Sequence, residues 1–137
     1  MKKLLTLSFL PTSANLALLV LRLWLGLTMV IVHGWPKLTG FSSMASGFFD
    51  PLGIGSRLSL GLSTFAELVC AALVAIGLAA RFAAAVLVVN LGVAFLLVHK
   101  LALTGAMSGE IAFVYLAGFV AILVAGPGRY AVDGRSG

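Results

Sequence analysis

Four long apolar stretches, at about residues 16–34, 58–80, 82–101 and 109–126, take up most of this 137-residue sequence. A helix needs about 20 mainly apolar residues to cross a bilayer, and each stretch comes close to that length. Only 9% of the residues are charged, whereas soluble domains carry about 25%. The sequence therefore predicts a single all-α domain over residues 1–137, an integral membrane four-helix bundle surrounded by the lipid bilayer.

The segment between the first two stretches, residues 35–57, differs from both. It is too rich in glycine and proline to form a span, and too apolar to lie free in water. We expect an interfacial or re-entrant loop between helices 1 and 2, with a short helix near residues 42–49.

Basic residues indicate how the spans are oriented. Four spans place both termini on one side of the membrane, and that side would carry Lys2, Lys3, Arg81, Arg129 and Arg135. The opposite side would carry Lys37, Arg57 and Lys100. Because positive residues favour the cytoplasmic side, we expect both termini to be cytoplasmic.

Polar residues inside the spans are the first candidates for a functional site, because each is costly in lipid and needs a partner or a role. We predict depths of about 9 Å for Arg22, 20 Å for Glu67 and 12 Å for Asn90, measured from the cytoplasmic end. Depth favours pairing of Arg22 with Asn90, and charge favours pairing with Glu67. A structural clamp or a functional centre would satisfy the same requirement.

A second group of polar residues, His33, Lys37, His99 and Glu110, is predicted near the other ends of the spans. They could form a pocket above Glu67. These residues also have structural alternatives: interfacial histidines, a headgroup anchor at Lys37, and a first-turn acid at Glu110.

Helical periodicity refines this picture. At 100° per residue, His33 falls on the face of Arg22, with Gly26 and Met29 between them. The same spacing places Asn90 and His99 on opposite faces of the third span. The second span carries a stripe of mostly small or polar residues that would let helices approach closely: Ser56, Ser59, Ser63, Glu67, Cys70 and Val74.

Several functions are disfavoured. The basic residues form no cluster, which argues against nucleic-acid binding. The single cysteine, Cys70, rules out an internal disulfide or a CxxC redox pair. The histidines and glutamates lack the close spacing of a dedicated metal site, so we expect no metal and no intrinsic cofactor.

Three segments resemble the DoxX family of small bacterial membrane proteins: "LRLWLGLTMVIVHGWPKLTGF" at 21–41, "FAELVCAALVAIGLAARFAA" at 65–84 and "GEIAFVYLAGFVAILVAGPGRYAVD" at 109–133. The resemblance implies a four-helix protein of the bacterial inner membrane. It also implies an association with redox systems, as an auxiliary, oxidoreductase-associated subunit of a quinone or thiol/sulfur complex.

On this basis we expect a membrane or soluble redox partner protein, with a quinone as a possible ligand of the polar residues. The alternatives are a proton-coupled carrier for a small solute, which would require a homo-oligomer, and a structural membrane adaptor.

Overall fold

The computed structural model describes residues 5–9 and 11–135, and the regular structure within these ranges is helical, without strands. The elements are α2 (Ala14–Thr28), the π-helix η1 (Met29–Gly34), α3 (Trp35–Thr39), α4 (Phe41–Met44), α5 (Ser56–Thr64), the π-helix η2 (Phe65–Cys70), α6 (Ala71–Ile76), α7 (Ala80–Val93), the π-helix η3 (Ala94–Val98), α8 (Glu110–Ala125) and the 3₁₀-helix η4 (Asp133–Arg135). The all-α prediction is confirmed.

These elements join into three long apolar helices. The first long helix combines α2, η1 and α3 over 26 residues, the second combines α5, η2 and α6 over 21, and the third combines α7 and η3 over 19. Each has the length and composition to cross a membrane. The fourth apolar helix, α8, has 16 residues, or about 24 Å. The described residues thus contain three helices capable of spanning a membrane, and a fourth span stays a prediction.

Local sequence explains where these helices begin and end. The Ser13 hydroxyl accepts a hydrogen bond from the Leu16 amide at 3.2 Å, an N-cap for α2. The second long helix ends at Gly77, which adopts a left-handed conformation (φ 78°) that favours glycine. This stop precedes the predicted end near residue 80.

The first long helix continues beyond its predicted end, through Pro36 to Thr39. Proline normally interrupts a helix because its ring clashes with an earlier carbonyl. Here a π-helical turn precedes it, in which the Trp35 amide donates to the Val30 carbonyl five residues back. The wider turn accommodates the proline, so residues 35–39 are helical rather than part of the loop.

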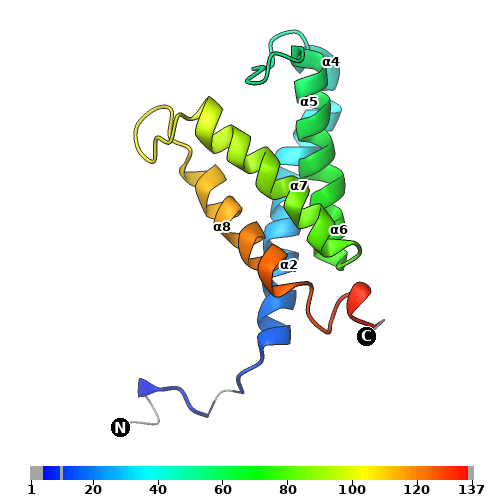
Figure 1. The fold of residues 1–137 in the computed structure, drawn as a ribbon, viewed down its shortest axis with the longest axis vertical. Helices are drawn as coiled ribbons and strands as arrows, with labels where there is room; N and C mark the ends of the chain where they lie inside the picture. Colours follow the sequence, from blue (N-terminus) through cyan, green and yellow to red (C-terminus); the bar gives the residue numbers. More distant parts are fainter. Residues whose placement is uncertain (1–4, 10, 136–137) are drawn as a thin grey trace.

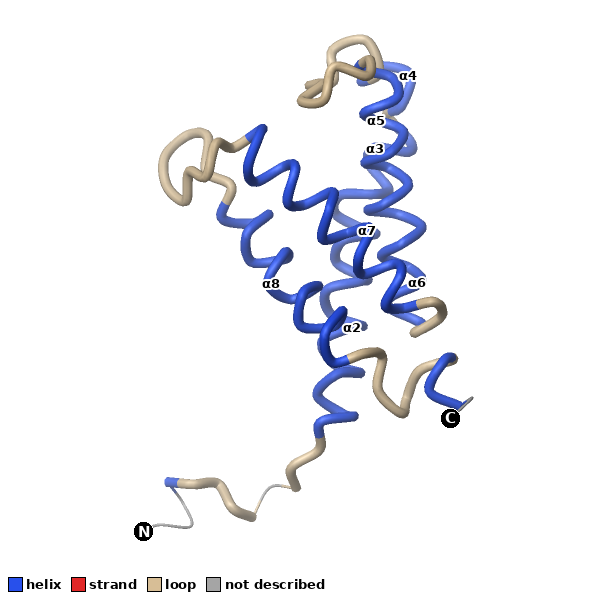
Figure 2. The backbone as a smooth tube through the Cα atoms, viewed as in Figure 1, coloured by secondary structure: helices blue, strands red, loops and turns tan. Residues whose placement is uncertain are grey.

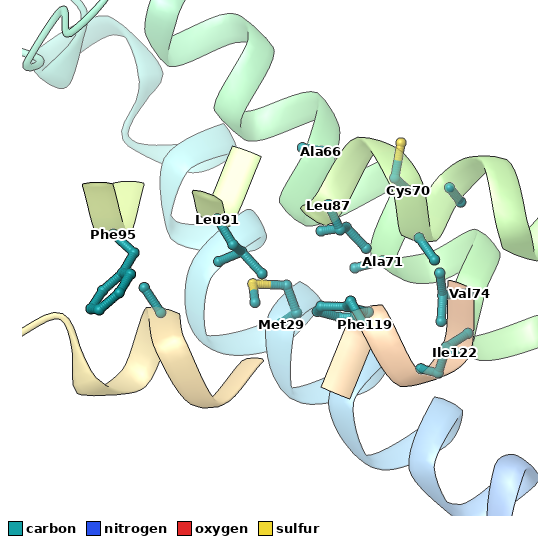
Figure 3. Close-up of a cluster of buried hydrophobic side chains, with 13 residues drawn as sticks. Met29, Ala66, Cys70, Ala71, Val74, Leu87, Leu91, Phe95, Phe119 and Ile122 are labelled. Carbon is teal, nitrogen blue, oxygen red and sulfur yellow. The ribbon is translucent and has the colours of Figure 1, made fainter. Parts of the chain in front are cut away.

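The helices pack most closely in the lower half of the molecule, near the two termini (Figure 1, Figure 2). There Met29, Leu87, Phe119 and Ile122 from three different helices meet in a buried apolar cluster (Figure 3). In the upper half, the hairpin of α7 and α8 diverges from the pair formed by α3 and α5 (Figure 1). The buried core thus packs the helices together in the lower half of the molecule, whereas the helices separate in the upper half.

The connection between the first two long helices lies at the upper end of the molecule (Figure 1). It contains the short helix α4 and then the non-helical residues 48–55. The Asp50 carboxylate accepts hydrogen bonds from the amides of Ile54 (3.1 Å) and Gly55 (2.6 Å) and from the Ser59 hydroxyl (2.7 Å). Asp50 therefore ties the connection to the start of α5.

Candidate functional site

A compact polar cluster lies between the three long helices. The Glu67 carboxylate forms an ion pair with the Lys37 ammonium. It also accepts hydrogen bonds from the Ser63 hydroxyl and the Asn90 amide, both at 3.1 Å. Lys37 additionally donates to the Ser63 oxygen at 2.9 Å. We call Lys37, Ser63, Glu67 and Asn90 the polar cluster.

The polar cluster is well shielded and has no net charge. The Glu67 side chain is 8% exposed and the Lys37 side chain 18%. An unpaired charge at such burial would be strongly unfavourable, and the ion pair with its added hydrogen bonds compensates for this. The stripe predicted on the second long helix is confirmed here, since Ser59, Ser63 and Glu67 are all buried.

Close approach of two backbones makes the ion pair possible. A Cβ atom at Gly34 would lie 2.6 Å from the Glu67 carbonyl oxygen and 2.7 Å from the Leu68 Cα. Only glycine fits at this crossing of η1 and η2. Lys37 follows Gly34 by about one turn in the extended helix, and its side chain therefore reaches Glu67.

A cavity of about 650 Å³ adjoins the polar cluster. The polar part of its lining consists of Lys37, Ser59, Ser63, Glu67, Asn90 and His99. Most of the rest of its surface is apolar and comes from α5, η2, α7, η3 and the connection at residues 48–54. The cavity therefore offers one polar end to a mainly hydrophobic ligand.

The predicted pocket of His33, Lys37, His99 and Glu110 is only partly assembled. Lys37 and His99 line the cavity. His33 instead packs edge-on against Tyr115 of α8, with ring centroids 5.8 Å apart. Glu110 is exposed in the first turn of α8, the position given as its structural alternative, and its amide donates to the Ser108 hydroxyl at 3.2 Å.

Two predictions about helix faces are wrong, and π-helical turns explain both. A π turn contains one more residue than an α turn and shifts the faces beyond it. In η1 the shift makes Gly34, not His33, the buried residue that follows Met29. In η3 it brings His99 to the same cavity as Asn90.

The predicted pairing of Arg22 with Glu67 or Asn90 is also wrong. Arg22 is fully buried, and its guanidinium donates to the carbonyls of Val74 and Ala75 (both 3.3 Å) and of Tyr130 (2.8 Å). Helix carbonyls near a C-terminus lack amide partners and carry partial negative charge. Arg22 thus stabilises the end of α6, away from the cavity lining, as a structural clamp.

The C-terminal segment completes this second cluster. The Asp133 carboxylate accepts from the Ala80 amide at 3.0 Å, at the start of α7, and the Asp133 amide donates to the Gly77 carbonyl at 2.9 Å. The Asn15 side chain accepts from the Arg129 amide at 2.9 Å. We call Asn15, Arg22, Arg129, Tyr130 and Asp133 the lower clamp. It ties residues 129–133 to the first long helix and to the α6–α7 turn.

A model of the DoxX family matches residues 17–100, which is more than half of the chain. The chain belongs to the DoxX family. The matched region contains the whole polar cluster of this DoxX protein and ends before α8. Comparisons with curated proteins and with solved structures gave no match.

Sequence reasoning on this DoxX protein did not identify Ser63 as a partner of Lys37 or Tyr130 as a partner of Arg22. Ser63 precedes Glu67 by four residues on a stripe of small residues, which was the available signal. The Tyr130 contact uses a backbone carbonyl 108 residues away, and no side-chain pattern indicates it. Within residues 5–9 and 11–135, no three His, Cys, Asp or Glu side chains are grouped as metal ligands would be.

Proposed function

We propose that this DoxX protein is an auxiliary subunit of a redox-linked membrane complex and binds a quinone-type head group at the polar cluster. The observation that carries the proposal is the cavity of about 650 Å³ with apolar walls and one polar end. Cavities of this size and lining hold small organic ligands in other proteins.

The charge of the polar cluster supports a neutral head group. Lys37 and Glu67 neutralise each other, so an anionic ligand would face Glu67 and a cationic ligand would face Lys37 in a poorly hydrated site. A quinone ring is neutral and carries oxygens that accept hydrogen bonds. The Lys37 ammonium has three N–H donors, of which two serve Glu67 and Ser63.

In this proposal the electrons come from a partner protein in the membrane or in solution. The chain has one cysteine, Cys70, and so has no thiol pair of its own. The start of α2 and the segment that follows α8 lie at the same end of the molecule (Figure 1), and in this proposal that end faces the cytoplasm, with the protein in the bacterial inner membrane. The larger number of basic residues that the sequence assigns to that side supports this orientation.

The ligand proposal is tested by quinone binding to the full chain in lipid nanodiscs. Asn90→Leu keeps the branched shape of the side chain but removes its hydrogen bonds, and Glu67→Gln breaks the ion pair. We expect each variant to weaken binding about tenfold, the effect of one lost polar contact in a buried site. Glu110→Gln, on an exposed glutamate outside the cavity lining, serves as the control. Unchanged affinity in both cavity variants would refute a head-group site at the polar cluster.

The redox role needs a separate test. We expect a pull-down in mild detergent to recover a redox enzyme, and deletion of the chain to alter quinol oxidation rates in membranes. A chain that purifies alone and whose deletion leaves these rates unchanged would contradict the role in a complex.

A further inference from the structure

The walls of the cavity also form part of the outer surface of the helices. Leu62 and Phe65 on the second long helix line the cavity and are 52% and 47% exposed. Val89 on the third long helix lines it too and is 66% exposed. In a membrane protein, exposed apolar residues in the middle of spanning helices contact lipid. The cavity therefore opens sideways, between these two helices, toward the bilayer.

The upper end of the cavity is apolar as well. Phe48, Pro51, Leu52 and Ile54 of the connection between the first two long helices line it there. The Phe48 ring lies 5.9 Å from the Lys37 ammonium and so lies over the polar cluster on that side. A polar solute arriving from water would have to pass these side chains, whereas a lipid-soluble molecule would meet only apolar surface at the lateral opening.

We propose that the ligand of this cavity is a lipid-soluble molecule with a hydrocarbon tail, which enters from the bilayer and leaves its tail in the lateral opening. The opening is the gap lined by Leu62, Phe65 and Val89. The head group contacts the polar cluster, and the tail continues among the lipid acyl chains. The head-group part rests on the proposed function, whereas the lateral opening is an independent feature of the cavity.

Two probes test the position of the tail: a benzoquinone that carries a decyl chain, and the same ring without the chain. Both are titrated against the full chain in nanodiscs. Val89→Trp fills the opening from an exposed position and spares the polar cluster. We expect it to weaken binding of the decyl quinone about tenfold and to change binding of the bare ring less than about twofold.

Val124→Trp on α8 is the matched control, because Val124 is 76% exposed and lies outside the cavity lining. It should leave both affinities unchanged. Equal weakening of both probes by Val89→Trp would overturn the assignment of the opening to the tail. Unchanged affinity of the decyl quinone would overturn it as well.

A third probe separates this inference from the quinone proposal. A long-chain alcohol with a photoreactive group in its tail is neutral and contains no quinone. We expect it to label peptides that contain residues 62–65 and 85–89, and Val89→Trp to reduce this labelling. Labelling without any quinone binding would refute the proposed function and support the lateral lipid site. Absence of labelling at both segments would overturn the lateral site.

Discussion

Arg22 and Glu67 are both charged and buried, yet they are stabilised in different ways. Glu67 has a lysine partner on another helix. Arg22 uses backbone carbonyls from α6 and from the C-terminal segment, and the Asp133 carboxylate adds a favourable electrostatic contribution. The planar guanidinium of arginine can donate to several carbonyls at once. The ammonium group of lysine, on a shorter side chain, is less suited to such contacts.

Replacement of Arg22 tests whether its role is structural. We expect Arg22→Met to lower the free energy of unfolding by about 2–3 kcal/mol, since it removes the three hydrogen bonds that this buried side chain donates. Arg22→Lys should recover part of the loss. Chemical unfolding in detergent micelles measures both, with Arg57→Met, at an exposed arginine near the start of α5, as control. Quinone affinity of the folded Arg22→Met protein should equal that of the unmodified protein, and a tenfold loss would instead assign Arg22 to the ligand site.

At the scale of elements, the crossing of η1 and η2 determines the geometry of the polar cluster. We expect Gly34→Ala to cost about 1–3 kcal/mol of unfolding free energy, because its methyl group would meet backbone atoms of Glu67 that cannot rotate away. Gly61→Ala in α5 is the control. A Cβ there meets nothing within 4 Å, and alanine should stabilise that helix by about 0.5–1 kcal/mol. Similar effects of both substitutions would contradict a tight crossing at Gly34.

The connection at residues 48–55 should respond to acid through Asp50. Hydrogen bonds from Ser59 and from the Gly55 and Ile54 amides lower the pKa of Asp50 below its ordinary value of 3.8. The ionised carboxylate therefore stabilises this turn above that value, and the stabilisation is lost as the pH falls through the lowered pKa. Hydrogen exchange at the Ile54 and Gly55 amides, corrected for intrinsic rates, should accelerate in that range. Asp50→Asn should remove this dependence, and a transition that persists in Asp50→Asn would implicate another group.

The apolar stretches and the stripe on the second long helix were predictable, because composition and helical spacing determine them directly. The π-helical turns were not, since nothing in the local sequence of η1 or η3 distinguishes them from α-helix. Their effect on residue faces explains why His33 and His99 were misplaced. Lys37 was assigned to the loop at residues 35–57 because that segment is rich in glycine and proline. The π turn before Pro36 accommodates the proline, and residues 35–39 are helical.

At the scale of the whole molecule, the polar cluster and the lower clamp occupy different parts of the fold and share no hydrogen-bond partner among the contacts described. Their contributions to stability should therefore be independent. We expect the unfolding free-energy changes of Arg22→Met and Glu67→Gln to add within about 0.5 kcal/mol in the double variant. Unfolding of the two single variants and the double variant in the same detergent measures this. A larger deviation would reveal coupling between the two ends of the bundle.

The contact between Arg22 and Tyr130 has a consequence for biosynthesis. Arg22 emerges from the ribosome early, whereas the Tyr130 carbonyl follows 108 residues later. Until then the first helix must enter the membrane with an incompletely satisfied arginine, which favours keeping it near the protein-conducting channel or its lipid interface. A chain that stops before Tyr130 would lack this hydrogen bond to Arg22. The Arg22–Tyr130 contact therefore forms only after the helices that precede Tyr130 have been synthesised.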